Sequence, residues 1–123
     1  MSVVLGNGDG TLQAVVNYAG GAGATGVASG DVNGDGYPDL VITTEYECKT
    51  CNDGGVNVLR GTGSGTFLGA ERFSAGGNGG GAASPVIADL NGDGHPDVVV
   101  VTGLSSDGTG YSGVSVLLNN SRY

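Results

Sequence analysis

The chain has 123 residues and a formal net charge of −8, with only four basic side chains, 27 glycines and no tryptophan. So few cations exclude a basic surface for nucleic acid or anionic lipid, and no apolar run reaches the roughly 18 residues that membrane insertion requires. Because glycine is a poor helix former, we expect one all-β domain, residues 1–123, with many tight turns.

The N-terminal segment predicts a β-hairpin. A short apolar strand at 2–5 precedes the turn Gly6-Asn7-Gly8-Asp9-Gly10-Thr11, and a second strand is expected at 11–16. The turn contains a single carboxylate, and Leu5 occupies the position where a first metal ligand would be needed. We therefore interpret this segment as a turn and not as a metal site.

A strand of small residues at 27–30 leads into the loop Asp31-Val32-Asn33-Gly34-Asp35-Gly36-Tyr37-Pro38-Asp39, which places oxygen side chains at positions 1, 3, 5 and 9. Ca²⁺ prefers about six to eight oxygen ligands in a flexible shell. A sharp bend is expected at Gly36, and Pro38 restricts φ before the last ligand. The predicted ligands are the side chains of Asp31, Asn33, Asp35 and Asp39 and the backbone carbonyl of Tyr37.

The loop is not an EF-hand, because that motif needs a bidentate glutamate at position 12 and a helix after it. Position 12 is Ile42 here, and the residues at 40–44 are mostly β-branched. We expect the loop to continue directly into a strand.

The insert at 45–53 contains Cys48 and Cys51. One C-x-x-C is half of a zinc site, and no second pair completes it. A disulfide between Cys48 and Cys51 is the favoured interpretation, while free thiols and a metal shared between subunits stay open. The insert, with Tyr46, is the expected contact loop for a partner.

The rest of the chain repeats this order. Strands are expected at 56–59 and 66–73 around the turn 61–66, and at 85–88, 98–101 and 114–117, with a glycine-rich connection at 76–81. The second loop predicts a second Ca²⁺, because its oxygen residues have the same spacing. Its expected ligands are the side chains of Asp89, Asn91, Asp93 and Asp97 and the backbone carbonyl of His95. Since Tyr37 occupies the equivalent position, we expect the His95 side chain to be exposed and not a ligand.

One repeat is four short strands in about 58 residues, and four-stranded sheets packed radially make a β-propeller. We expect strands 3 and 4 of a partial blade at 1–18, a complete blade at 19–75 and strands 1 to 3 of a further blade at 76–123. The strand at 2–5 is expected to match those at 56–59 and 114–117. The valine run at 98–101 predicts a strand covered on both faces.

The two loops, the turn at 5–11 and the ending at 114–120 resemble the FG-GAP/VCBS repeat family over nearly the whole chain. This resemblance implies calcium-loop propeller blades like those of integrin α-subunit heads, with about two blades of four antiparallel strands per chain. It also implies a secreted or cell-surface protein. The propeller would be completed by a homo-oligomer, with a trimer as the first expectation, or by the remainder of a larger chain.

The expected function is a non-enzymatic module in which two structural Ca²⁺ ions support an adhesive, lectin-like or protein-binding surface. No catalytic residues are assigned, because the sequence offers no histidine-centred triad and no cysteine with a base. The alternatives are a fragment of a propeller enzyme, similar to a polysaccharide lyase or a phospholipase, and a structural spacer without a ligand.

Overall fold

The computed structural model describes residues 1–45, 54–76, 81–103 and 112–120, and these residues form an all-β fold. Among them, no helix is long and apolar enough to cross a membrane. The strands are β1 (Ser2–Val3), β2 (Val16–Asn17), β3 (Ala24–Gly30), β4 (Asp39–Thr44), β5 (Gly55–Leu59), β6 (Glu71–Ser74), β7 (Ala82–Ala88), β8 (Asp97–Thr102) and β9 (Gly113–Leu117).

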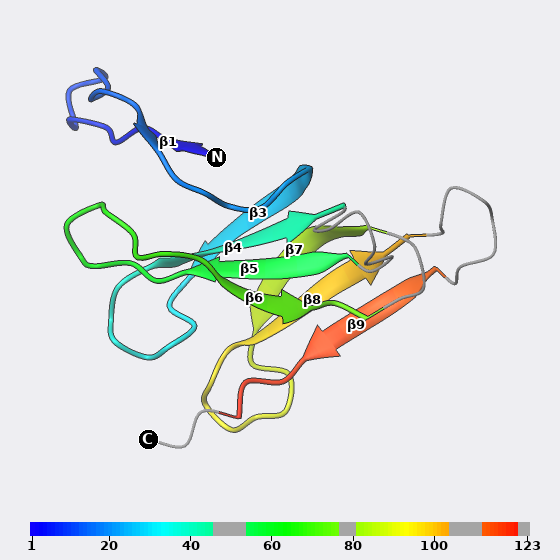
Figure 1. Ribbon diagram of the computed structural model, residues 1–123. Helices are drawn as coiled ribbons and strands as arrows, with labels where there is room; N and C mark the ends of the chain where they lie inside the picture. The colour runs from blue at the N-terminus through cyan, green and yellow to red at the C-terminus, as the bar shows by residue number, and fades with distance from the viewer. Residues whose placement is uncertain (46–53, 77–80, 104–111, 121–123) are drawn as a thin grey trace.

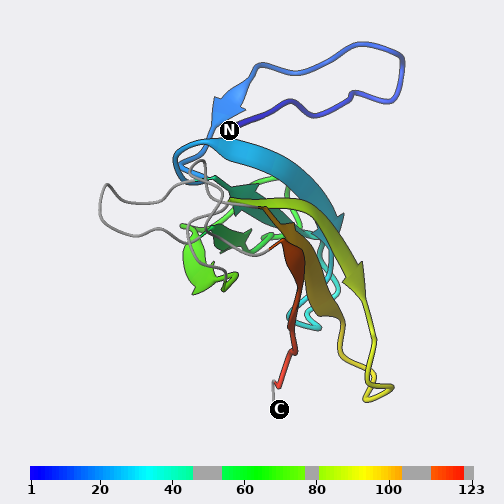
Figure 2. The same ribbon diagram turned by 90° about the vertical axis from the view of Figure 1, so that its right-hand side faces the viewer.

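These strands form three antiparallel sheets, a hairpin of β1 and β2, a first sheet in the order β3-β4-β5-β6 and a second sheet in the order β7-β8-β9. Figures 1 and 2 show the first and second sheets stacked on each other, with the hairpin beyond the first sheet. Each of the two larger sheets is built from strands that follow one another in the chain.

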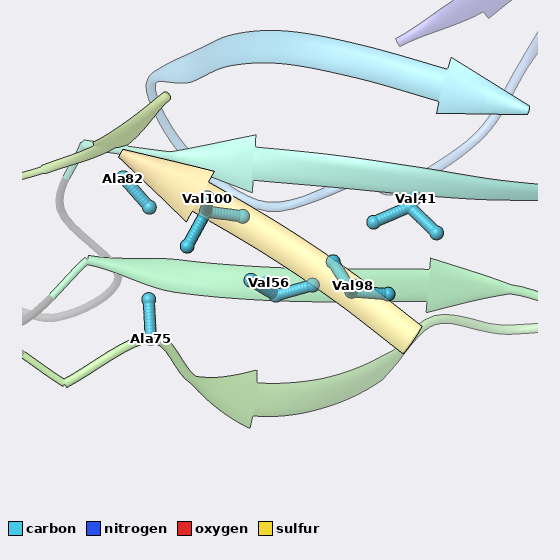
Figure 3. Close-up of a cluster of buried hydrophobic side chains, with 6 residues drawn as sticks. All are labelled: Val41, Val56, Ala75, Ala82, Val98 and Val100. Carbon is cyan, nitrogen blue, oxygen red and sulfur yellow. The ribbon is translucent and has the colours of Figure 1, made fainter. Parts of the chain in front are cut away.

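The core lies between the first and second sheets. On β4 and β5, Val41 and Val56 are completely buried, and they pack with Val98, Val100 and Ala82 of the second sheet. Figure 3 shows β8 crossing β4 and β5 with these side chains between the strands. Because side chains alternate along a strand, the odd-numbered residues of β4 face this core.

The opposite face of the first sheet is covered by the N-terminal hairpin. Ile42 and Leu59 are 1% exposed, and a side chain at Gly20 would collide with Ile42 and approach Met1. The rings of Tyr18 and Phe67 meet edge to face with centroids 5.5 Å apart. The strand β4 is therefore covered on both faces.

Strands β3 and β7 lie side by side, and small residues allow their close approach. A Cβ atom on Gly26 would lie 2.8 Å from Cδ of Pro85, and one on Gly30 would lie 3.1 Å from Cδ1 of Ile87. The hydroxyl of Thr25 also donates to the carbonyl of Ala82. The small residues expected in this strand thus serve contact between the two sheets.

The expected burial of the valine run at 98–101 is wrong for one face. Val98 and Val100 are buried, whereas Val101 is 47% exposed. The physical reason is that the first sheet covers only one side of β8. Val99 and Val101 point to the other side.

The structure also corrects the expected fourth strands and one alignment. The strands expected at 11–16 and 66–73 are shorter, since only β2 and β6 form ladders, after the isolated bridges Gly6↔Leu12 and Gly61↔Phe67. In the hairpin, Ser2 of β1 pairs with Asn17 of β2, and in the first sheet Asn57 of β5 pairs with Arg72 of β6 at the equivalent position. Residues 2–5 therefore correspond to 57–60 and not to 56–59, a one-residue shift that exchanges the faces of the strand.

Candidate metal centre

The two loops, at 31–39 and 89–97, have the same backbone turn. Gly34 and Gly36 have φ angles of 74° and 86°, and Gly92 and Gly94 have φ angles of 75° and 87°. Residues with a side chain rarely adopt this left-handed region. The bend expected at Gly36 is confirmed, and Gly34, Gly92 and Gly94 have the same backbone conformation.

In the first loop, the carboxylate of Asp31 is surrounded by backbone N–H groups. Its Oδ1 accepts from the N–H of Gly34 at 2.8 Å and of Asp35 at 3.1 Å, and its Oδ2 accepts from the N–H of Gly36 at 2.8 Å. These bonds hold the side chain toward the inside of the turn.

Asp35 and Asn33 extend the same network. The Oδ1 atom of Asp35 accepts from the N–H of Tyr37 at 2.8 Å, and its Oδ2 accepts from Nδ2 of Asn33 at 2.9 Å. The Oδ1 atom of Asn33 accepts from the N–H of Asp35 at 2.9 Å. The first three predicted side-chain ligands thus lie in one hydrogen-bonded turn.

The closing Asp39 has a different environment, because it is completely buried at the start of β4. Its Oδ2 accepts from the N–H of Val32 at 3.0 Å, and its Oδ1 accepts from the N–H of Gly61 at 2.8 Å. Asp39 therefore joins the start of the loop to the end of β5.

The second loop repeats these contacts. Asp89 accepts from the N–H groups of Gly92, Asp93 and Gly94 at 2.8, 3.2 and 2.9 Å. The remaining bonds are His95 N–H to Asp93 at 2.8 Å, Asn91 Nδ2 to Asp93 at 2.9 Å, Asp93 N–H to Asn91 at 3.0 Å, Leu90 N–H to Asp97 at 2.9 Å and Asn119 N–H to Asp97 at 2.8 Å.

A comparison with protein families identifies the repeat. The model of the FG-GAP-like repeat matches residues 1–42 and 48–100, which is most of the chain. The chain belongs to the FG-GAP-like repeat family. No curated protein and no solved structure matched it.

One carboxylate of the second FG-GAP loop has a shifted pKa. The backbone N–H of His95 and the side chain of Asn91 lower the pKa of Asp93 by hydrogen bonding to its charged form, and the charge of His95 acts in the same direction. Asp93 is exposed to solvent. The loop therefore favours an ionised carboxylate at this position.

The FG-GAP loops fit a hard cation in donor chemistry, because every predicted side-chain ligand is a carboxylate or amide oxygen. Within the described ranges, no group of three acidic, histidine or cysteine side chains is gathered closely enough to hold a metal ion. The closing Asp39 and Asp97 are instead bound to backbone N–H groups. Each carboxylate oxygen has two lone pairs, so one N–H leaves capacity for a cation.

The side chains of Tyr37 and His95, whose carbonyls are predicted ligands, have different environments. Tyr37 is 47% exposed, and its ring lies against Gly63, where an added Cβ would be 2.4 Å from Cε1. His95 is half-buried and not fully exposed as expected.

Other sequence predictions fall outside the described residues. Cys48 and Cys51, with most of the insert at 45–53, lie there, as does the centre of the glycine-rich connection at 76–81. Their pairing and contacts stay predictions.

Sequence reasoning missed three residues that support the loops, namely Val32, Gly61 and Asn119. They bind the closing aspartates through their backbone N–H groups, which residue types do not reveal. The available signal was positional, because Gly61 and Asn119 both stand two residues after the last strand residue of β5 and β9.

A groove of about 470 Å³ lies between the two sheets. Its apolar lining includes Val56 and Phe73 from the first sheet and Val98 and Leu117 from the second. The groove runs beside β9, which is the last strand of the second sheet in the described residues.

Proposed function

We propose that the chain is a calcium-binding β-propeller module without enzymatic activity. The observation that carries this proposal is the repeated hydrogen-bonded network of oxygen side chains in two loops of one geometry. Local turn formation alone requires neither a second copy nor four oxygen residues at the same spacing. Membership of the FG-GAP-like family supports the same function.

Each loop would hold one Ca²⁺ through Asp31, Asn33, Asp35, Asp39 and the Tyr37 carbonyl, or through Asp89, Asn91, Asp93, Asp97 and the His95 carbonyl. The ion would supply positive charge among three carboxylates that otherwise repel one another. Its role would be structural, because binding to the folded state alone adds RT ln(1 + [L]/Kd) to the free energy of unfolding.

The test is thermal unfolding in EDTA and in excess Ca²⁺. At about 100-fold excess over Kd each site contributes about 2.7 kcal/mol, so we expect Tm to rise by roughly 10 °C or more. The double variant Asp35→Asn/Asp93→Asn should lose most of this rise. Asp9→Asn, which removes a carboxylate from a glycine turn outside the loops, is the matched control and should keep it. Equal Tm values for the unmodified protein in both solutions would contradict the proposal.

The propeller would be completed by another blade on the uncovered side of the second sheet. Val101, Val114 and Val116 are 47%, 66% and 49% exposed there, and the equivalent face of the first sheet is buried in the core. The covering blade would come from a second copy, in a ring with a trimer as first expectation, or from a larger chain. Mass measurement in solution, with and without Ca²⁺, distinguishes a ring from a monomer.

The assembled propeller would present an adhesive surface for a glycan or a protein outside the cell, where Ca²⁺ is abundant. The carboxylates of both loops accept hydrogen bonds from backbone N–H groups of their own loop, which is consistent with a structural role for the loops. A glycan array with the calcium-loaded protein tests this part. Binding that disappears in EDTA is the expected result, and absence of binding to every glycan would leave a protein ligand as the proposed partner.

A further inference from the structure

A chain of hydrogen bonds connects the closing aspartates of the two loops across the interface between the sheets. The N–H of Val32 donates to Asp39 at 3.0 Å. The carbonyl of Val32 accepts from Nδ2 of Asn119 at 2.6 Å, and the N–H of Asn119 donates to Asp97 at 2.8 Å. Val32 lies in the first loop and Asn119 follows β9, so these two residues link the closing aspartates of both loops.

The side chain of Asn119 is what makes this link possible. Its amide also donates to the carbonyl of Pro96 at 3.2 Å, so its two N–H groups reach a carbonyl in each loop. The equivalent residue of the first sheet is Gly61. Its N–H makes the same bond to Asp39 at 2.8 Å, but it has no side chain to reach another loop.

The surroundings of this hydrogen-bonded link favour transmission of a structural shift from one closing aspartate to the other. Asp39 and Asp97 are completely buried, and Val32 packs against the hydrophobic core between the sheets. The hydrogen bonds of the link are partly buried, and a hydrogen bond is stronger where the surroundings exclude part of the water. A shift of one closing aspartate therefore moves groups that the other depends on.

We propose that Asn119 couples the two loops, so that a cation bound in one loop raises the affinity of the other. This inference rests on the proposed calcium function. An ion in the second loop orders Asp97, and with it Asn119 and Val32, so the first loop loses less conformational entropy when it binds its own ion. Repulsion between the two ions acts in the opposite direction but is screened over about 8 Å at physiological salt.

The experiment measures Ca²⁺ binding by isothermal titration calorimetry in about 0.15 M salt. Asp93→Asn weakens the second loop without touching the linking residues, and the affinity of the first loop is then compared with and without this change. In the otherwise unmodified protein we expect a loss of about fivefold or more. In an Asn119→Ala background the same change should alter first-loop affinity by less than about twofold. Asn120→Ala, an exposed asparagine one residue further on, is the matched control and should behave like the unmodified protein.

An equal effect of Asp93→Asn in both backgrounds would overturn the coupling. A role of Asn119 in stability alone would lower Tm and leave the ratio of affinities unchanged, which separates the two roles. If the unmodified protein binds no Ca²⁺, the proposed function fails instead.

The link itself can be measured in the metal-free protein by amide hydrogen exchange. Asn119→Ala should accelerate exchange of the Val32 N–H about tenfold relative to Asn120→Ala, while the N–H groups of β4 and β5 change little. Uniform acceleration, or none at Val32, would show that the side chain of Asn119 does not hold the first loop.

Discussion

The first and second sheets share one sequence pattern and one loop geometry. The corresponding faces of the two sheets nevertheless differ in solvent exposure. Val56 and Thr43 of the first sheet are completely buried, whereas the equivalent Val114 and Val101 of the second sheet are 66% and 47% exposed. The loops of both sheets nevertheless form the same hydrogen bonds. Local structure is therefore set within each repeat, while burial is set by the neighbouring sheet.

This difference separates two kinds of stabilising interaction. Bonds made inside one repeat should contribute equally in both sheets. Contacts made between repeats should contribute only where a neighbour is present. Matched substitutions at equivalent positions distinguish the two.

The largest effect is expected at the closing aspartates, where the sheets should behave alike. Asp39→Ala removes the acceptor of two N–H groups, those of Val32 and Gly61. Because an unsatisfied buried polar group costs about 1–3 kcal/mol, the free energy of unfolding in EDTA should fall by about 2–5 kcal/mol. Asp97→Ala should cause a similar fall. Urea denaturation measures both, and a much smaller effect of Asp97→Ala would show that loop closure depends on the stacked neighbour.

A glycine at the sheet interface should distinguish the sheets most clearly. A Cβ atom on Gly54 would lie 2.2 Å from the backbone nitrogen of Ala82, so Gly54→Ala forces β5 and β7 apart. We expect a loss of about 2–3 kcal/mol in the free energy of unfolding. The equivalent Ser112 is exposed, and Ser112→Ala should change stability by less than about 0.5 kcal/mol. Similar losses for the two variants in urea denaturation would contradict the stacking.

The equivalent valines Val56 and Val114 should show a smaller difference in stability between the two sheets. Val56→Ala removes two methyl groups from a completely buried site and should cost about 2 kcal/mol. Val114→Ala should cost less than about 0.5 kcal/mol in a monomer. Denaturation at several protein concentrations gives a further measurement. A cost of Val114→Ala that grows with concentration would show that another copy covers this face.

Much of this architecture was predictable from the sequence because the loops carry strong local signals. The spacing of Asp31, Asn33 and Asp35, with glycine at two bends, determines the turn through local hydrogen bonds. The positions of β3, β4, β7 and β8 follow from it, since a strand must enter and leave each loop. All-β structure followed from the glycine content and the β-branched runs.

The remaining features depend on contacts that composition does not encode. The run at 98–101 is as apolar as a strand covered on both faces, but only a neighbouring sheet can cover it. Likewise, Asp39 has the same residue type as Asp35, and only its place at the start of β4 makes it a buried acceptor. Asn119 had no chemical signal, because its role comes from the backbone atoms that it reaches.

The two glycine turns allow a final, smaller comparison between the hairpin and the first sheet. In the turn at 6–11, Asp9 accepts from the hydroxyl of Thr11 at 2.6 Å and from its N–H at 2.9 Å. The side-chain bond and then the backbone bond lower the pKa of Asp9 below its ordinary value. In the turn at 61–66, Ser64 occupies the equivalent position and shares its hydroxyl with Thr62 and Thr66.

Thr11→Val should therefore raise the pKa of Asp9 toward its ordinary value, as measured by NMR titration of its carboxyl carbon. A carboxylate whose pKa is lower in the folded state adds stability above the unfolded pKa, and this stability is lost as the pH falls through the folded pKa. The variant should accordingly lose part of the stability that Asp9 contributes at neutral pH. Thr66→Val changes a turn in which Thr66 contacts no carboxylate. It should leave the dependence of the free energy of unfolding on acidic pH unchanged. An Asp9 titration midpoint that is the same with and without the Thr11 hydroxyl would show that the backbone N–H alone holds the carboxylate.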